Sequence, residues 1–394
     1  MKIKRVFLIV ADSLGIGAAE DAHKFYNGNG TDVGSDTFGA LVNHKGFSAP
    51  FLQKLGIGNI DGVAYPASES PIAAYGKLVE QSAGKDTVTG HWEICGVVTD
   101  RPMPTFPNGF PEDFLNEFSK RVGRGYLCNK TYSGTEVIKD YGKEHIETGK
   151  LIIYTSSDSV FQIAAHEDVV PIEDLYKYCE TARKMLRGDM AVGRVIARPF
   201  VGDESSGYQR TANRRDYALE SPSETLCDIM SANGYEVIGV GKIGDIFAHR
   251  GITEEIHTES NADGIEKTKQ MLDRDFIGLC FVNLVDFDSK YGHRRNIDGY
   301  ADAVMYFDRE LKKMSEKLLD EDILIITADH GCDPSHIGTD HTREDVPLLI
   351  YGKNIKCVNI GTRRSFADLG KTIADMFDIE SCPIKGVSFK NIIM

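Results

Sequence analysis

Short runs of apolar and β-branched residues recur along the chain, separated by segments whose apolar residues repeat with the 3.6-residue period of a helix. The runs predict strands at 5–10, 74–79, 235–240, 275–284, 322–327 and 346–351. The periodic segments predict helices at 221–234, 261–273, 298–319 and 365–378. Strands that are apolar along their whole length are typical of sheets buried on both faces. The pattern therefore predicts an α/β fold in which a mostly parallel sheet is flanked by helices.

The middle of the chain has a different pattern. It opens with the proline-rich segment RPMPTFPNGFP and closes with the charged, turn-like segment DESSGYQRTANRRD. Between them lie predicted strands at 151–156 and 192–202 and a predicted helix at 172–188. We therefore expect an inserted α+β cap domain over 100–217, within a core domain formed by 1–99 and 218–394.

Composition narrows the class of protein. A chain of 394 residues with 41% hydrophobic and 26% charged residues is expected to form two soluble globular domains. Its net charge of −14 argues against a nucleic-acid or anionic-membrane partner. No apolar run approaches the ~20 residues that cross a bilayer, and the first run ends at Asp12 without a cleavage-type continuation. The eight cysteines form no CxxC pair, which favours reduced thiols and a cytoplasmic location.

Three predicted strands run into aspartates. Asp12 follows the first strand, Asp286 and Asp288 follow the strand at 275–284, and Asp329 follows the strand at 322–327. A single aspartate in this position is most often a loop cap. Because the carboxyl ends of parallel strands share one edge of a sheet, all of these carboxylates are expected to gather there.

Histidines follow two of these aspartates closely. His293 comes shortly after Asp288, and His330 and His341 lie in the stretch TADHGCDPSHIGTDHTRE (327–344), which crowds six Asp and His side chains. Such a density of Asp and His is costly to bury without a cation. The set is too large for one tetrahedral site and suits two adjacent divalent ions. Without a thiolate, since we interpret Cys332 as a packing residue, the set favours a harder ion such as Mn²⁺ over zinc.

A nucleophile candidate lies in GKDTVTGHWE (84–93). Thr87 occupies a glycine-bounded turn beside Asp86. A threonine in such a turn is usually structural, but next to a metal centre its hydroxyl is activated as a nucleophile. His91, in the same segment, is interpreted with His166 and His249 as a residue that forms local hydrogen bonds.

The segment GVGKIG (239–244) matches the dinucleotide-binding pattern G-x-G-x-x-G. It lies far along the chain, and no predicted strand ends in an acidic residue about 20 residues later, as that pattern requires. We interpret it as a tight strand-to-helix turn from which Lys242 reaches a phosphate.

Several long motifs carry a family resemblance. VADSLGIG, GKDTVTGHWEICG, NLVDFDSKYGHRR and TADHGCDPSHIGTDHTREDVPLL occur in this order, together with TSSDSVFQIAAHE in the middle segment. The chain resembles the alkaline phosphatase superfamily and, within it, the prokaryotic phosphopentomutase family. The likeness extends over nearly the whole length.

The resemblance implies an isomerase that interconverts ribose 1-phosphate and ribose 5-phosphate, and the 2-deoxyribose pair, through phosphothreonine and a sugar bisphosphate that also primes the enzyme. It implies two divalent metal ions, most simply Mn²⁺. The implied ligands of one ion are Asp12, Thr87, Asp329 and His330, and those of the other are Asp288, His293 and His341. The implied substrate contacts are Ser156, Val160, Arg194, Ile196 and Arg210 in the cap and Lys242 in the core.

Other functions remain open at this point. A metal-dependent phosphomonoesterase would use the same residues, and a phosphoglycerate-specific relative would use serine where this chain has Thr87. A binding protein with structural ions and a nicotinamide dehydrogenase built on GVGKIG are the alternatives from other classes. The expected partners are small sugar phosphates, with no nucleic acid and no membrane, for a monomer or weak oligomer.

Overall fold

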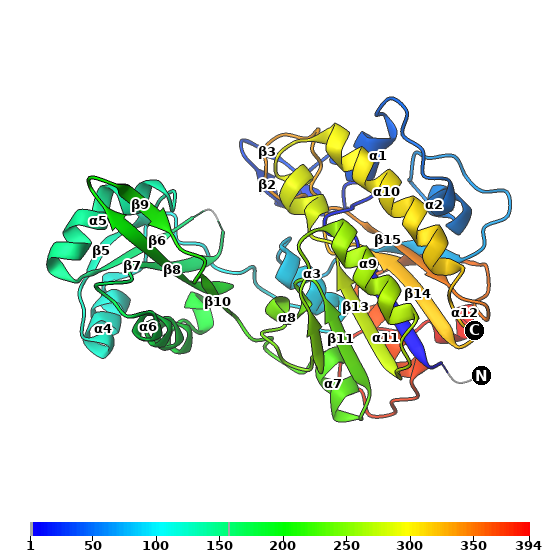
Figure 1. The fold of residues 1–394 in the computed structure, drawn as a ribbon. Coiled ribbons are helices and arrows are strands. Elements are labelled where there is room, and N and C mark those ends of the chain that lie inside the picture. The colour runs from blue at the N-terminus through cyan, green and yellow to red at the C-terminus, as the bar shows by residue number, and fades with distance from the viewer. Residues whose placement is uncertain (1–2, 157) are drawn as a thin grey trace. The chain divides into compact units, whose positions relative to one another are not determined.

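The computed structural model describes residues 3–156 and 158–394. Its contacts divide the chain into two compact units, Met1–Pro102 with Ser221–Met394, and Met103–Glu220. We call the first the core unit and the second the insert unit (Figure 1). Within the described ranges, no helix has both the length and the apolar character needed to cross a membrane.

The core unit is built on an eight-stranded sheet with the order β12-β11-β13-β1-β14-β15-β4-β16. Its strands are β1 (Arg5–Val10), β4 (Ala74–Leu78), β11 (Glu236–Val240), β12 (Glu254–Ile256), β13 (Gly278–Asn283), β14 (Asp322–Thr327), β15 (Val346–Tyr351) and β16 (Asn359–Arg363). Only β15 among them runs antiparallel to its neighbours, so the predicted mostly parallel sheet is confirmed. The sequence pattern missed β12 and β16 because these edge strands are short and partly exposed, and so lack a long apolar run.

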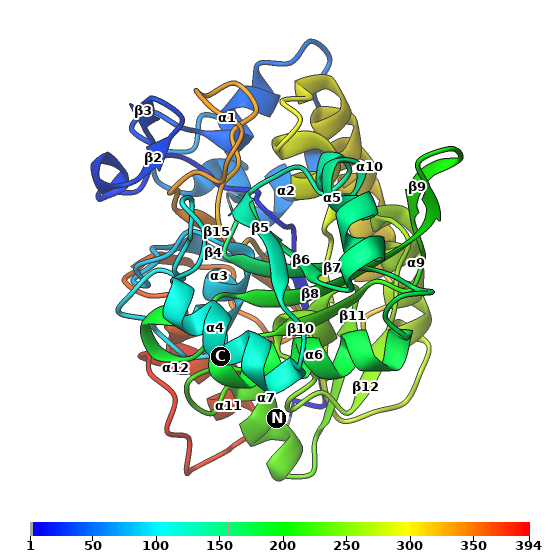
Figure 2. The ribbon, with the colours of Figure 1, turned by 90° about the vertical axis from the view of Figure 1, so that its left-hand side faces the viewer.

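Helices cover both faces of this sheet. They are α1 (Thr37–Val42), α2 (Pro50–Leu55), α3 (Thr87–Ile94), α7 (Leu226–Ala232), α8 (Ile243–Ile246), α9 (Asn261–Leu272), α10 (Ile297–Ser315), α11 (Ala367–Met376) and α12 (Lys390–Ile393). Helix α10 packs with α1, α2 and α9 on one face, and α11 packs with α3, α7 and α12 on the other (Figures 1 and 2). All four predicted helices are present, and the polar caps Thr225 of α7 and Ser260 of α9 set where two of them begin.

The insert unit contains a smaller mixed sheet. Its strands are β5 (Tyr126–Thr131), β6 (Leu151–Thr155), β7 (Val160–His166), β8 (Arg194–Asp203), β9 (Gly207–Arg210) and β10 (Arg215–Ala218). The order is β10-β8-β7-β6-β5, with β9 added to β8. Helices α4 (Glu112–Val122) and α6 (Ile172–Met185) pack over an apolar cluster on one face, whereas α5 (Glu136–Thr148) supplies Val137 and Ile138 to the cluster on the other.

Strands β13, β1 and β14 lie side by side in the centre of the core sheet, and their ends are level. Val10 is the register partner of both Asn283 and Thr327. The chain therefore leaves all three strands at one edge, where the sequence places its acidic residues. The short π-helix η4 (Phe287–Gly292) follows β13 directly at this edge.

Candidate metal centre

Three aspartates at the ends of the central strands are buried together. Asp12 and Asp329 are fully buried and Asp288 is 7% exposed. Each keeps one carboxylate oxygen without a hydrogen-bond partner in the described chain: Oδ1 of Asp12, Oδ1 of Asp288 and Oδ2 of Asp329. Buried carboxylate oxygens are rarely left unpaired, because their desolvation is costly. The arrangement is suited to a cation.

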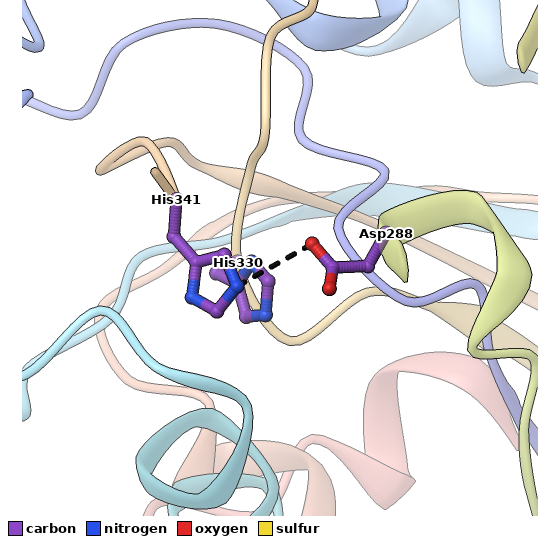
Figure 3. A group of neighbouring side chains, drawn as sticks. All are labelled: Asp288, His330 and His341. Carbon is purple, nitrogen blue, oxygen red and sulfur yellow. Dashed lines mark ion pairs between the residues drawn. The ribbon is translucent and has the colours of Figure 1, made fainter. Parts of the chain in front are cut away.

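Three histidines direct their Nε2 atoms at these carboxylates. His330 Nε2 lies 3.5 Å from Asp12 Oδ1 and 3.3 Å from Asp329 Oδ2. His341 Nε2 lies 3.4 Å from Asp288 Oδ1, and His293 Nε2 lies 3.2 Å from Asp288 Oδ2. Figure 3 shows the rings of His330 and His341 stacked beside Asp288, with ring centroids 3.9 Å apart.

These separations match the spacing of ligands around metal ions. Donor atoms about 2.1 Å from one octahedral ion lie roughly 3 Å from one another. Asp12, Asp329 and His330 form one group within 4.8 Å. In the second group, the Nε2 atoms of His293 and His341 are 3.1 Å apart and both face Asp288. The residues therefore fit two adjacent divalent cations.

The other ring nitrogen of each histidine is bonded to the backbone. Nδ1 of His330, His293 and His341 lies 3.0, 2.7 and 3.0 Å from the carbonyl oxygens of Gly331, Thr339 and Lys85, respectively. A carbonyl only accepts, so Nδ1 carries a hydrogen, and in the neutral ring Nε2 presents a lone pair. Such outer hydrogen bonds hold metal-binding histidines in the required tautomer and orientation.

The buried charges of both groups act on one another. Burial and the charges of Asp329 and Asp288 raise the pKa of Asp12 well above its usual value. Burial alone would lower the pKa of His341, but the Asp288 carboxylate outweighs it and raises that pKa to about 10. Burial alone would raise the pKa of Asp288, but His341 and His293 hold it well below its usual range. The site favours positive charge.

Not every acidic or imidazole side chain of 327–344 belongs to this centre. Asp333 accepts hydrogen bonds from the backbone N–H groups of Asp36 and Ser335, and His336 contacts the carbonyl of Thr31. These residues stabilise loops. Asp286 likewise accepts from the Asn261 backbone, so Asp288 is the strand-end acid that faces the histidines.

Cys332 lies near Asp288 and His293, within a group of possible ligand atoms. Its sulfur approaches His293 from the Nδ1 side, at 4.0 Å, where the ring already bonds the Thr339 carbonyl. Burial also raises the pKa of this thiol well above its usual value. The geometry agrees with the interpretation of Cys332 as a packing residue.

Thr87 is the first residue of α3 and is half-buried. Its Oγ1 lies 3.1 Å from His330 Nε2, which places the hydroxyl beside the first group of ligands. Asp86 caps the helix, because its Oδ1 accepts from the backbone N–H groups of Val88 and Thr89. The cap fixes the turn that presents the hydroxyl.

Comparison with known proteins identifies the family. Residues 4–381 match the model of the Metalloenzyme superfamily. The chain is 55% identical over 390 residues to the phosphopentomutase of Lachnoclostridium phytofermentans, with 98% of each chain covered. It is 52% identical to the phosphopentomutase of Caldanaerobacter subterraneus subsp. tengcongensis, with 96% of this chain and 95% of that one covered. This chain belongs to the phosphopentomutase family.

A solved structure supports the fold. The PH0037 protein from Pyrococcus horikoshii superposes with a TM-score of 0.51 at 15% identity, covering 97% of this chain and 99% of that chain. A similar α/β fold is thus found in a distant chain of similar extent. Phosphopentomutases are isomerases, and membership of this family identifies the chain as an enzyme.

The substrate contacts expected for a phosphopentomutase in the insert unit share one face of its sheet. Val160 is the register partner of Arg194, and Ile196 and Arg210 follow at positions with the same orientation. Ser156 comes directly after β6. The side chains of Val160 and Ile196 are 2% exposed and form the floor of this face, whereas Arg210 is exposed.

Sequence reasoning missed Arg198 on the same face. It is half-buried, and its Nε donates to Gln162 Oε1 at 3.1 Å. Burial and the charges of Arg214 and, less strongly, Arg210 lower the pKa of Arg198. The nearby Tyr154 hydroxyl is buried without a hydrogen-bond partner in the described chain. Alternation along β8 was the available signal, because Arg198 has the orientation of Arg194 and Ile196.

Lys242 lies in the core unit, in the turn between β11 and α8, and is exposed. The GVGKIG segment forms a strand followed by a tight turn, as predicted. Gly241 adopts φ +83°, and a Cβ there would lie 2.5 Å from the carbonyl oxygen of Asn283. Because β11 is parallel to β13, Lys242 lies at the same sheet edge as the aspartates.

Two further histidine predictions can be placed. His166 Nε2 bonds the Gly202 carbonyl at 3.0 Å within the insert, and His249 Nδ1 bonds Glu255 at 2.7 Å. His91 Nδ1 makes the expected local hydrogen bond, to the Thr87 carbonyl at 2.8 Å, and it also lies 3.1 Å from Asp329 Oδ2, a residue distant in the sequence.

Proposed function

We propose that this chain interconverts ribose 1-phosphate and ribose 5-phosphate, and the corresponding 2-deoxyribose phosphates, through a phosphothreonine at position 87. The observation that carries the proposal is the Thr87 hydroxyl beside His330 Nε2, at the edge where three buried carboxylates each retain an unpaired oxygen. The names of the relatives, over nearly the full length of the chain, support the mutase reaction.

Membership of a metalloenzyme superfamily and the clustered ligands support divalent metal binding. We propose Mn²⁺ in both positions, because carboxylate and imidazole without thiolate favour it over a zinc site. Asp12, Thr87, Asp329 and His330 would hold one ion, and Asp288, His293 and His341 the other. The bound ions would neutralise phosphoryl oxygens and favour the alkoxide form of the threonine hydroxyl.

The chain itself positions the reacting groups. Asp86 occupies the N–H groups of Val88 and Thr89, so the beginning of α3 has few free donors for a phosphate. The phosphoryl group on Thr87 therefore depends on the ligand cluster for neutralisation. Backbone carbonyls hold the three histidines with Nε2 facing this point.

The proposed cycle conserves phosphate. The Oγ–P bond of phosphothreonine breaks as the free hydroxyl of a pentose phosphate bonds to phosphorus and loses its proton. The resulting bisphosphate turns around and returns its other phosphoryl group to Thr87. A sugar bisphosphate, or enzyme that is already phosphorylated, is required to start the cycle.

We call the face of the insert sheet that carries Arg194, Arg198 and Arg210 the arginine face. It would bind the phosphate group that is not being transferred. Arg194 and Arg210 present guanidinium groups, which bind phosphate in a bidentate geometry. Ser156, Val160 and Ile196 would line the sugar-binding surface around them. In the core unit, Lys242 is proposed as a further substrate contact.

Product analysis tests the function. With ribose 5-phosphate, Mn²⁺ and a catalytic amount of sugar bisphosphate, phosphorus NMR should show ribose 1-phosphate and almost no inorganic phosphate. Stoichiometric inorganic phosphate without ribose 1-phosphate would contradict the mutase and support the phosphomonoesterase alternative. An enzyme that does not act on pentose phosphates but does turn over phosphoglycerate would instead be the phosphoglycerate-specific relative.

We further propose that the enzyme acts in the cytoplasm as a monomer or weak oligomer, on small sugar phosphates and without nucleic acid or membrane. The net charge of −14 supports the absence of nucleic-acid partners. The lack of disulfides among the cysteines supports a reducing compartment.

A further inference from the structure

His91 lies outside both groups of ligands but contacts the first one directly. It projects from α3, and its side chain is fully buried. Nδ1 lies 2.8 Å from the carbonyl oxygen of Thr87 and 3.1 Å from Oδ2 of Asp329. One ring nitrogen therefore faces both the backbone of the nucleophile and a strand-end carboxylate.

The other ring nitrogen faces Asn283, the last residue of β13. His91 Nε2 is 3.4 Å from Asn283 Nδ2, and the same amide nitrogen donates to Asp12 Oδ2 at 2.8 Å. An amide nitrogen carries two hydrogens, so it serves both acceptors. The arrangement requires a lone pair on His91 Nε2 and a hydrogen on Nδ1, which is the tautomer that the Thr87 carbonyl also requires.

We infer that His91 and Asn283 form a positioning pair that orients the ligands of the first metal position. This inference rests on the proposed binuclear function. Asn283 holds Oδ2 of Asp12, so Oδ1 is turned toward His330. The Ser13 N–H holds Oδ1 of Asp329 at 3.1 Å, while His91 faces Oδ2. Outer hydrogen bonds of this kind contribute about 10–100-fold to metal affinity.

A histidine with only a packing role would have different partners. His145 in the insert unit is such a residue: it is fully buried, with Nδ1 bonded to the Lys150 carbonyl and Nε2 accepting from the His166 backbone. Both of its partners belong to the backbone of its own unit. Both nitrogens of His91 instead contact residues that hold or form the first ligand group. His145 is therefore a matched control.

The test is calorimetric titration of metal-free protein with Mn²⁺, with circular dichroism to verify folding. His91→Phe keeps an aromatic ring against Phe281, whose ring centroid is 5.8 Å away. We expect one of the two ions to bind about 10–100-fold more weakly and the other unchanged. His91→Asn retains a donor near the Nδ1 position and should recover part of the loss. Asn283→Ala should weaken the binding of the same ion, and the double variant with His91→Phe should lose less affinity than the sum of the two single losses.

Kinetics supplies an independent measurement. At saturating Mn²⁺, kcat of His91→Phe should fall while KM for ribose 5-phosphate stays within about twofold, because the variant disturbs the ligands and not the sugar contacts. His145→Phe should lower the melting temperature but leave both Mn²⁺ affinities unchanged.

If folded His91→Phe binds both Mn²⁺ ions with affinities within twofold of those of the parent protein, the proposed pairing of His91 with Asn283 is wrong. If that variant does not fold, the same result in Asn283→Ala would overturn it. A parent protein that binds no Mn²⁺ at all would instead overturn the binuclear proposal, and this inference with it.

Discussion

The strand-end edge of the core unit and the arginine face of the insert unit hold charge in contrasting ways. At the edge, Asp12 and Asp329 are fully buried and their positions are set by backbone register. On the face, the Arg194 side chain is 39% exposed and Arg210 more so, at the ends of flexible side chains. Buried carboxylates are strongly coupled to one another, whereas exposed guanidinium groups are screened.

This contrast indicates a division of tasks. A buried, prearranged cluster stabilises charge that develops during phosphoryl transfer, so its loss should lower kcat. In the proposed function, the exposed arginines would bind and release a phosphate group, so their loss should raise KM. Changes at the edge should therefore act on turnover and changes on the face should act on binding.

The largest effect is expected from Thr87→Ala. Removing the nucleophile should lower kcat by roughly 10⁴-fold or more, because among the described residues no other hydroxyl is hydrogen-bonded to His330 Nε2. Isomerisation of ribose 5-phosphate and incorporation of labelled phosphate into the protein would both be measured. Thr89→Ala is the matched control: its hydroxyl donates to Asp86 Oδ2 at 2.6 Å, so it should cost about 1 kcal/mol of stability and leave turnover within tenfold. Labelled Thr87→Ala would contradict the proposed nucleophile.

The next effect concerns the number of bound ions. Asp329→Asn and Asp288→Asn each weaken one ligand group, so each should reduce the Mn²⁺ stoichiometry from two to one and lower kcat by about 10³-fold. Metal analysis of equilibrated protein measures the stoichiometry. If both variants lose both ions together, the two groups form one inseparable site and the division is wrong.

A smaller effect should come from the face. Arg198→Gln removes a guanidinium that Gln162 orients, and should raise KM for ribose 5-phosphate about 10–100-fold, the value of a charge-assisted hydrogen bond, with kcat nearly unchanged. Steady-state kinetics at two salt concentrations measures both. Arg215→Gln is the control, because Arg215 pairs with Ala197 in register and so faces the opposite side of the sheet. An equal rise in KM for both variants would indicate that substrate binding depends on the overall positive charge of the insert unit rather than on a specific contact with Arg198.

The sequence predicted the residues at the strand-end edge of the core unit better than those on the arginine face of the insert unit, for a physical reason. A buried strand needs a continuous apolar run, and the aspartate after it is visible in one segment, as at Asp12 and Asp329. Asn283 and His91 are far apart in sequence, and no local pattern shows that they meet. Arg198 could have been found from strand alternation, but its partner Gln162 could not.

The same limit applies to the fold. Central strands β1, β13 and β14 were predictable because both faces are buried, whereas β12 and β16 at the sheet's ends carry polar residues. The predicted helices extend beyond the observed helix ends where the following turn continues the helical period, as after α9 and α10.

A pH-dependent effect should follow from Glu344, which lies buried below the edge. Burial raises the pKa of Glu344 to about 7, although Thr342 and Thr37 donate to it. Because the folded-state pKa is above the unfolded value, the stabilising contribution is present below about pH 4.5 and is lost as pH rises through 7. In metal-free protein, Glu344 alone should therefore contribute a loss of about 3 kcal/mol of unfolding free energy as pH rises over this range.

Urea unfolding of metal-free protein between pH 4.5 and 8 measures this slope. Glu344→Gln should flatten this slope. The hydroxyls of Thr37 and Thr342 face Oε1 of Glu344, and they can also accept hydrogen bonds from a glutamine amide group at that position. An unchanged slope in Glu344→Gln would assign the pH dependence to other groups at the edge.

The smallest effect is expected from Cys332→Ala, which separates packing from ligation within the edge itself. The sulfur reaches His293 only from the side of Nδ1, whose hydrogen is directed at Thr339, so the thiol should contribute nothing to Mn²⁺ binding. Both affinities should stay within twofold, with a stability loss of about 1 kcal/mol from the small cavity. Titration with Mn²⁺ and then Cd²⁺ provides the check, because a thiolate ligand favours the softer ion. A variant that loses Cd²⁺ affinity but keeps Mn²⁺ affinity would show that the geometry leaves this thiol available to soft metals, which would contradict its interpretation as a packing residue.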